Sequence, residues 1–177
     1  MGFPKALLRY REETFLDRLA SLFAARCSPV IVVLGAEAER IRSSAHSAAT
    51  FVVNPDWARG QTTSMQCGLR AVPPEADGVL FTLVDHPAVA PATIDALLAG
   101  PRATLLRVPR HHGRRGHPIW FSREIVPEFL ALAETGAARD VVRSHAAQTE
   151  FLDVDDPGIL ADIDDPAAYR GLTGEDA

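Results

Sequence analysis

The chain has 177 residues, 47% of them hydrophobic, which is enough for one domain with a proper core. No leader pattern and no apolar run of ~18 residues is present, so we expect a cytoplasmic protein with no membrane partner. A net charge of −5 argues against a nucleic-acid partner. Cys27 and Cys67 lack the spacing of a metal or redox pair, so both thiols should be reduced.

The first residues contain a conformationally restricted lysine. Pro4 fixes its own φ and disfavours helical geometry at Phe3, so Lys5 should be presented from an extended turn as a fixed positive charge. A solvated lysine near a chain end is the ordinary alternative.

Helices and strands alternate along the chain. Thr14 should cap an amphipathic helix that runs to about Ala25. The run from Val30 to Leu34 has no polar alternation, which favours a strand buried on both faces of a parallel sheet. The other predicted elements are helices at 37–44, 64–71, 92–99, 124–134 and 138–145, and strands at 50–53, 78–84, 103–108 and 118–121. This order predicts a single α/β domain over residues 1–177, with a mainly parallel sheet and helices on both faces.

Polar residues follow the predicted strands, where α/β sheets bind ligands. Asp85 comes directly after the strand at 78–84, so its carboxylate should project from a rigid strand end. Mg²⁺ prefers such oxygen ligands, and Asp164 could supply a second one. The alternative for Asp85 is a helix N-cap. The remaining acidic residues of the C-terminal part are interpreted as a solvated edge: Asp153, Asp155, Asp156, Asp162 and Asp165.

Two further segments could bind anions. Residues 60–69 put hydroxyl side chains at a helix start, although simple N-capping by Thr62 or Thr63 also explains them. A second segment is rich in arginine and histidine, which suits phosphate capture or a solvated mobile loop. Its basic residues are Arg102, Arg107, Arg110, Arg114 and Arg115, with His111, His112 and His117. The arginines would repel a cation, so a histidine metal site there is disfavoured.

Several ordered motifs resemble those of the MobA-like nucleotidyltransferase family, closest to its molybdenum-cofactor cytidylyltransferase branch. Residues 1–5 resemble the end of the family's LAAGxSxRMGxPK loop, and residues 54–68 are similar to its NxxxxxG–S–G stretch, with Ser64 and Gly68 at matching places. Residues 85–87 resemble DQP, 115–118 RGHP, 136–139 GAR and 162–169 DIDTPEDY. The resemblance covers nearly the whole chain.

The resemblance implies a Rossmann-like fold of the nucleotide-diphospho-sugar transferase type. The implied reaction transfers a nucleoside monophosphate, CMP being favoured, from an NTP to a phosphorylated acceptor such as a molybdopterin-type cofactor. Pyrophosphate is released. The implied residues are Lys5 and Asp85 for catalysis, Gly2, Lys5, Gln61, Ser64 and Gly68 for the nucleotide, Arg115, Gly116, His117 and Arg139 for the acceptor, and Asp85 and Asp164 for Mg²⁺.

Two departures from the family pattern leave alternatives open. His86 replaces the Gln of DQP, and no equivalent of the family's first strand and glycine-rich loop precedes Lys5, which should leave the flank of the strand at Val30 open. The chain could be an enzyme whose first ~15–20 residues are missing from this sequence. It could instead be a short non-catalytic nucleotide-binding or regulatory form that dimerises over the open strand. A sugar-1-phosphate nucleotidyltransferase is the third reading.

Overall fold

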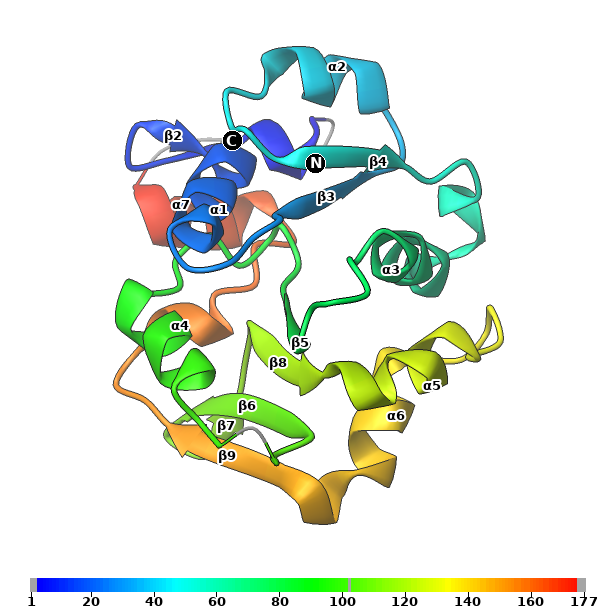
Figure 1. The fold of residues 1–177 in the computed structure, drawn as a ribbon. Coiled ribbons are helices and arrows are strands. Elements are labelled where there is room, and N and C mark those ends of the chain that lie inside the picture. Colours follow the sequence, from blue (N-terminus) through cyan, green and yellow to red (C-terminus); the bar gives the residue numbers. More distant parts are fainter. Residues whose placement is uncertain (1–2, 102, 175–177) are drawn as a thin grey trace.

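A computed structural model of the chain describes residues 3–101 and 103–174 as an α/β fold (Figure 1). The α/β class is therefore confirmed. The α-helices are α1 (Phe15–Ala24), α2 (Ala38–Ser44), α3 (Gln61–Arg70), α4 (Pro91–Leu98), α5 (Val126–Leu130), α6 (Ala138–Ser144) and α7 (Pro166–Thr173). The strands are β1 (Arg9–Tyr10), β2 (Glu13–Thr14), β3 (Ile31–Leu34), β4 (Thr50–Val53), β5 (Gly78–Phe81), β6 (Leu106–His111), β7 (Arg114–Arg115), β8 (Ile119–Ser122) and β9 (Thr149–Asp153). Short 3₁₀ helices are η1 (Lys5–Leu7), η2 (Trp57–Arg59), η3 (Arg123–Ile125), η4 (Ala146–Gln148) and η5 (Pro157–Leu160).

The described strands form three separate sheets. β1 and β2 pair as an antiparallel ribbon, and β3 pairs with β4 in parallel. The third sheet has the order β5-β8-β6-β7, with β9 on β6. Because β8 is antiparallel to both β5 and β6 while β9 is parallel to β6, the strands β5, β6 and β9 all run in one direction.

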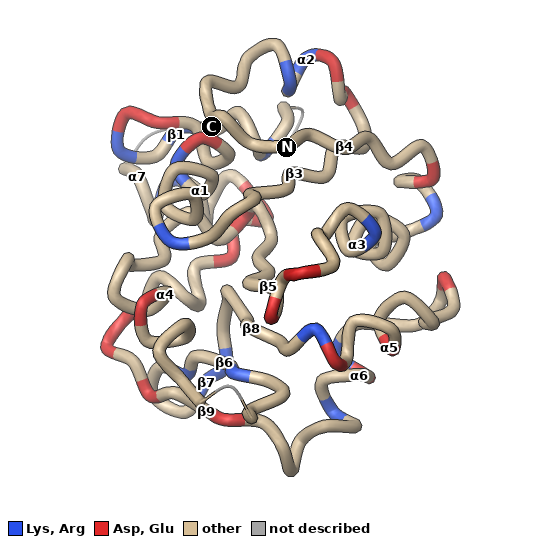
Figure 2. Tube along the Cα trace, viewed as in Figure 1, with Lys and Arg blue, Asp and Glu red and all other residues tan. Residues whose placement is uncertain are grey.

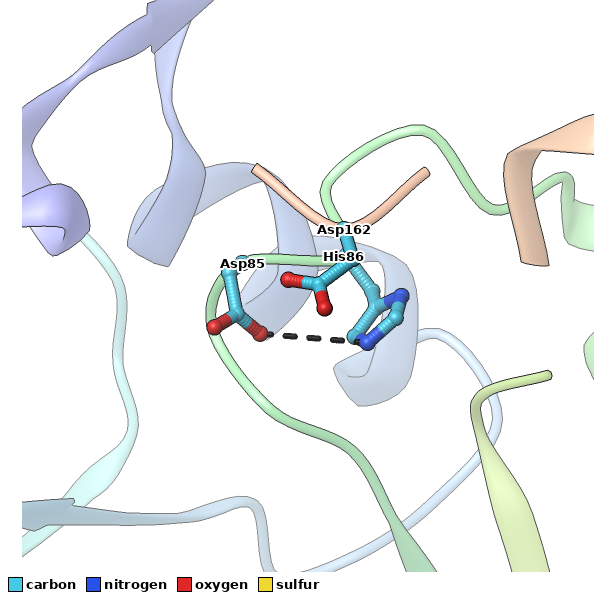
Figure 3. Close-up of side chains that lie close together, drawn as sticks. All are labelled: Asp85, His86 and Asp162. Atoms are coloured by element: carbon cyan, nitrogen blue, oxygen red, sulfur yellow. Dashed lines mark ion pairs between the residues drawn. The ribbon is translucent and has the colours of Figure 1, made fainter. Parts of the chain in front are cut away.

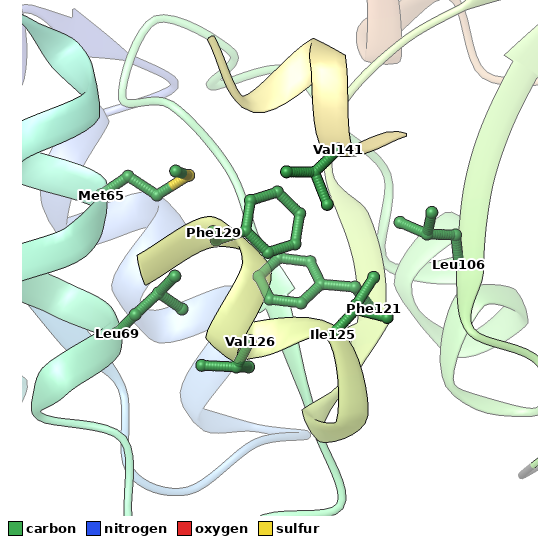
Figure 4. Close-up of a cluster of buried hydrophobic side chains, with 8 residues drawn as sticks. All are labelled: Met65, Leu69, Leu106, Phe121, Ile125, Val126, Phe129 and Val141. Carbon is green, nitrogen blue, oxygen red and sulfur yellow. The ribbon is translucent and has the colours of Figure 1, made fainter. Parts of the chain in front are cut away.

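Helix α3 connects the β3–β4 sheet to the five-stranded sheet. Its buried Met65 and Leu69 belong to a hydrophobic cluster whose Phe121 and Phe129 rings are 4.6 Å apart (Figure 4). On its other side, a Cβ added to Gly68 would lie 2.8 Å from Val33 Cγ2, so the helix approaches β3 closely. The cluster residues are Met65, Leu69, Leu106, Phe121, Ile125, Val126, Phe129 and Val141.

A cavity of about 560 Å³ lies between β3 and β5. Both strands line it along their lengths, and within residues 3–101 and 103–174 each of them is paired on one edge alone. The lining is largely aliphatic, and Pro4, Lys5 and Ala6 close one part of it. The edge of β3 that was expected to be open therefore borders this cavity, which forms a slot between β3 and β5.

Several element boundaries differ from prediction. Helix α3 begins at Gln61, three residues before the predicted start, and β6 ends at His111 instead of 108. The segment predicted as a solvated mobile loop is a hairpin in which Arg110 pairs with Arg115 and the chain turns through Gly113 at φ 79°. Strands β7 and β9 were not predicted, because two residues in one case and a mixed polar sequence in the other give no strand pattern.

Three features concern the molecule as a whole. Within the described part of the chain, no helix is long and apolar enough to cross a membrane. Acidic and basic positions are interspersed along the trace (Figure 2). Cys27 and Cys67 are free thiols, as expected, and burial raises the pKa of Cys27.

Candidate functional site

Lys5 links two carboxylates from distant parts of the chain. Its Nζ lies 3.3 Å from Oδ2 of Asp85 and also donates a hydrogen bond to Oδ1 of Asp164. The lysine and Asp85 are mostly buried, with 27% and 17% of their side chains exposed, whereas Asp164 is 68% exposed. Lys5 is the sole lysine of the sequence. Three residues that the sequence singled out separately therefore meet at one point.

The local backbone explains this meeting. Pro4 is extended at φ −59° and ψ 119°, and Lys5 opens the 3₁₀ helix η1. The sequence predicted a strand up to residue 84 with Asp85 directly after it, but β5 ends at Phe81 and Asp85 lies in a turn four residues further on. Its carbonyl accepts a hydrogen bond of 3.0 Å from the Ile163 amide, which holds the segment around 162–164 beside it. Asp165 then caps α7 by accepting from the Ala168 amide.

The charges at this point support one another. Burial lowers the pKa of Lys5, but the hydrogen bonds and charges of Asp164 and Asp85 outweigh it, so the pKa is raised above its ordinary value. The hydrogen bond from Lys5 lowers the pKa of Asp164. A protonated lysine between two carboxylates can stabilise negative charge that develops on a bound phosphate.

A second group, formed by Asp85, His86 and Asp162, could hold a metal ion. One ligand atom from each residue lies within 4.8 Å of the others, and the carboxylate of Asp162 points toward the other two side chains (Figure 3). Oδ1 of Asp85 is buried without a hydrogen-bond partner, which suits a cation. Burial and the charges of Asp85 and Asp164 raise the pKa of Asp162. Asp162 is exposed, as the sequence predicted, and it also lies beside Asp85 and His86, which the sequence did not predict.

His117 joins this group through His86. The two rings are 4.7 Å apart, and His117 Nδ1 is buried without a hydrogen-bond partner. Burial, with the neighbouring His86, lowers the pKa of His117 to about 4, and burial also lowers that of His86. Both histidines are therefore neutral at pH 7. Gly116, the residue before His117, has a steric role, since a Cβ there would lie 2.2 Å from the Ile159 carbonyl oxygen.

Asn54 organises the start of α3. It is 3% exposed, and its amide donates to the hydroxyls of Thr63 and Ser64 at 2.9 and 3.0 Å. Gln61 is exposed at the first position of the helix. With Lys5 and Gly68, Gln61 and Ser64 line the cavity between β3 and β5. The sequence did not predict this role of Asn54; an Asn directly after the strand at 50–53 and shortly before the hydroxyl residues at 62–64 is the signal that could have indicated it.

The other proposed acceptor residues lie on separate elements. Arg115 is exposed on β7, where its guanidinium lies 4.4 Å from the Phe151 ring, and Arg139 is exposed in the first turn of α6. Both elements are distinct from the turn after β5 that carries Asp85. Gly2, proposed for the nucleotide, and Arg102 lie outside the described residues.

Two residues of the predicted charged surfaces are buried instead. Arg107 is 2% exposed, donates to the Leu97 carbonyl and lies 4.1 Å from the Trp120 ring. Asp156 is 6% exposed and accepts from the Thr93 hydroxyl at 2.6 Å. Both are held by internal contacts, Arg107 also by an ion pair of 3.4 Å with Glu150, which a count of charges along the sequence does not reveal.

The chain belongs to the family of proteins with a MobA-like NTP transferase domain. The family model matches residues 1–149. This is a family of nucleotidyltransferases, as the motif resemblance implied. Membership implies that an NTP is a substrate.

Among curated proteins, the chain is 29% identical over 171 residues to a nicotine blue oxidoreductase of Paenarthrobacter nicotinovorans, covering 91% of this chain and 83% of that protein. It is 26% identical over 170 residues to the molybdenum cofactor cytidylyltransferase of Escherichia coli (strain K12), covering 94% and 85%. The crystal structure of Rv0371c from Mycobacterium tuberculosis H37Rv is 30% identical and superposes with a TM-score of 0.85 over 99% of this chain and 92% of that one. A second structure of Rv0371c, in complex with manganese, has a TM-score of 0.79, with coverages of 97% and 92%.

Proposed function

We propose that this protein transfers a nucleoside monophosphate from an NTP, with CTP favoured, to a small phosphorylated acceptor such as a molybdopterin-type cofactor. The observation that carries this proposal is the ion pair between Lys5 and Asp85. It puts a fixed positive charge beside a carboxylate in the turn that follows β5, beyond the carboxyl end of that strand, where α/β folds bind their ligands. The similarity to a molybdenum cofactor cytidylyltransferase favours CTP and this class of acceptor.

In the proposed reaction, an oxygen of the acceptor phosphate attacks the α-phosphorus of the NTP. The bond from the α-phosphorus to the oxygen that bridges it to the β-phosphorus breaks, and pyrophosphate leaves with that oxygen. Lys5 stabilises the charge on the transferring group. Catalysis of this kind consists mainly of positioning and charge neutralisation.

Two groups of residues are assigned to the two substrates. Gln61, Ser64 and Gly68 share the cavity lining with Lys5 and are assigned to the nucleotide, together with Gly2. Arg115, Gly116, His117 and Arg139 are assigned to the acceptor. For Gly116, the assignment is to the backbone, since its close contact with Ile159 leaves no room for a side chain.

Mg²⁺ is the proposed cation; Asp85 would hold it, and the ion would neutralise charge on the nucleotide phosphates. The buried, unpartnered Oδ1 of Asp85 supports this fit. Asp164, proposed from the sequence as the second ligand, bonds to Lys5 in the structure. In this arrangement Asp164 is a partner of Lys5, and its role as a metal ligand stays a prediction from the sequence.

A substrate panel tests the proposal. Purified protein is incubated with CTP, GTP, ATP or UTP, a divalent cation and each candidate acceptor, and pyrophosphate is measured. The acceptors include a molybdopterin-type cofactor and sugar 1-phosphates, which separates the proposed function from a sugar-1-phosphate nucleotidyltransferase. A parallel redox assay is included because one relative is named an oxidoreductase. Pyrophosphate release with CTP and the pterin-type acceptor supports the proposal, and release with a sugar phosphate alone contradicts it.

We also propose that the single domain is completed by one extended segment lying between β3 and β5. The slot is bordered by the unpaired edges of two strands, and its largely apolar lining suits a strand buried on both faces. Leu34 at the end of β3 and Val84 beyond β5 belong to one hydrophobic cluster, so the two strands end at the same side of the slot. Pro4 and Lys5 lie in its lining, so a short loop from a strand in the slot could continue into them.

Hydrogen exchange tests this completion. An apolar five-residue strand followed by a glycine-rich linker is fused ahead of Met1, and the control carries proline at the central strand position. We expect slower amide exchange in β3 and β5 with the first fusion alone. Equal exchange in both fusions would favour the alternative of a short, non-catalytic form whose slot stays unfilled.

A further inference from the structure

We propose that His86 is a direct nitrogen ligand of the divalent cation at Asp85, and that it shifts the preference of the site from Mg²⁺ toward first-row transition ions such as Mn²⁺. This inference rests on the proposed function in one respect, the assignment of the cation to Asp85. It goes further in naming which ligands complete the site and which ions they favour.

The position of the His86 ring is the first observation. The residue is 7% exposed, so its imidazole is withdrawn from water. Nε2 lies 3.8 Å from Oδ1 of Asp85, beyond hydrogen-bond range, and Nδ1 is buried without a hydrogen-bond partner. Buried polar atoms are normally hydrogen-bonded. Oδ1 of Asp85 has no such partner and Nε2 of His86 faces it, so a cation between these two atoms would supply the missing partner; Nδ1 is a different ring atom and takes no part in this contact.

The distances fit a cation between them. Two atoms that each bind a metal at about 2.1 Å lie at most about 4.2 Å apart. The separation of 3.8 Å between Nε2 and Oδ1 is within that limit. All three ligand atoms of Asp85, His86 and Asp162 lie within 4.8 Å of one another, and Asp162 is exposed, so its carboxylate has room to move closer and contribute a further oxygen.

Lys5 does not compete for the same oxygen. It bonds to Oδ2 of Asp85, whereas the proposed cation would bind Oδ1. Asp164 takes the other side of the lysine. Asp164 therefore bonds to the lysine, whereas Asp162 lies on the side of the proposed cation.

The ligand chemistry sets the ion preference. Mg²⁺ prefers an all-oxygen shell, whereas imidazole nitrogen favours transition ions. The family motif DQP, which resembles residues 85–87, has an amide where this chain has His86. An amide at that position offers an oxygen, so His86→Gln is a natural conversion of the site to oxygen ligands.

Electron paramagnetic resonance of bound Mn²⁺ provides the test. Spin-echo modulation detects a directly bound ¹⁴N nucleus, and the signal of free Mn²⁺ measures affinity with or without competing Mg²⁺. We expect nitrogen modulation in the unaltered protein. In His86→Gln we expect the modulation to be lost and the preference for Mn²⁺ over Mg²⁺ to fall about tenfold or more. His112→Gln, which removes an exposed imidazole from the β6–β7 turn, is the matched control and should change neither.

Each outcome decides a different point. Bound Mn²⁺ without nitrogen modulation in the unaltered protein overturns the inference, whatever happens to the folding of the variants. Unchanged modulation and ion preference in His86→Gln overturn it as well. Asp85→Asn separates the two proposals: if this variant binds Mn²⁺ as well as the unaltered protein, the assignment of the cation to Asp85 fails. If Asp85→Asn loses binding while His86→Gln behaves like the unaltered protein, only the inference about His86 fails.

Discussion

Lys5 Nζ lies 3.3 Å from Oδ2 of Asp85, although 80 positions separate the two residues in the sequence. The pair joins the 3₁₀ helix η1 to the segment that follows β5. We expect Lys5→Ala to lower turnover by about 10²- to 10³-fold, the usual cost of removing one preorganised charge-stabilising donor. Lys5→Arg keeps the charge with a different shape and should retain part of the activity. Steady-state pyrophosphate release measures both, and equal rates for Lys5→Ala and the unaltered protein would remove Lys5 from the reaction.

Asp85→Asn should abolish metal-dependent turnover, because the amide supplies a weaker metal ligand and no charge. Asp153→Asn is the matched control, since Asp153 is an exposed partner of Arg110 on the sheet edge and should leave turnover unchanged. Turnover is measured against cation concentration in both variants. A dependence on the cation that is the same in Asp85→Asn as in the unaltered protein would show that the metal binds elsewhere.

Gly116→Ala should destabilise the fold by about 1–3 kcal/mol, because the added Cβ would meet the Ile159 carbonyl oxygen at 2.2 Å. Gly171→Ala is the control, since nothing lies within 4 Å of a Cβ there and the position is inside α7. That change should be neutral or stabilise by up to about 1 kcal/mol. Urea unfolding compares the two, and equal stabilities would refute the steric argument.

The contribution of His145 to stability should depend on pH. Its Nε2 lies 2.8 Å from Oε1 of Glu128, and hydrogen bonds to Gln148 and Glu128 raise the pKa of the imidazole. A raised folded-state pKa means that the protonated ring stabilises the fold fully below the unfolded value of about 6.5. This contribution is lost as the pH rises through the folded-state pKa.

We therefore expect His145→Gln to lower the free energy of unfolding by about 0.5–1 kcal/mol at pH 5.5, with a smaller effect at pH 9. Unfolding by urea at the two pH values checks this. The pair is partly exposed, so high salt should reduce the effect at pH 5.5. An effect of His145→Gln that grows with pH would contradict the assignment.

The strongest sequence signals predicted the structure well. The apolar run ending at Leu34 and the capped helix starting after Thr14 both form, with the Thr14 hydroxyl accepting from the Asp17 amide. The strand before Asp85 also forms, although it ends at Phe81, four residues before Asp85. These features depend on local pattern, and local pattern is what a single sequence displays.

Features that depend on long-range contacts were missed. Asp162 and Asp164 are two positions apart, and only the fold shows that one faces His86 while the other bonds to Lys5. Arg107 resembles its basic neighbours in sequence, yet Trp120 and the Leu97 carbonyl bury it. Tertiary partners decide whether such charges are solvated, so composition alone cannot separate them.

The central claim is that Lys5 and Asp85 together bind the metal-bound triphosphate of a nucleotide. Calorimetric titration of CTP into the protein, with and without a divalent cation, tests it most directly, because no acceptor is needed. We predict binding that requires the cation and weakens at least tenfold in both Lys5→Ala and Asp85→Asn. CTP binding that is independent of the cation and unchanged in both variants would contradict the account.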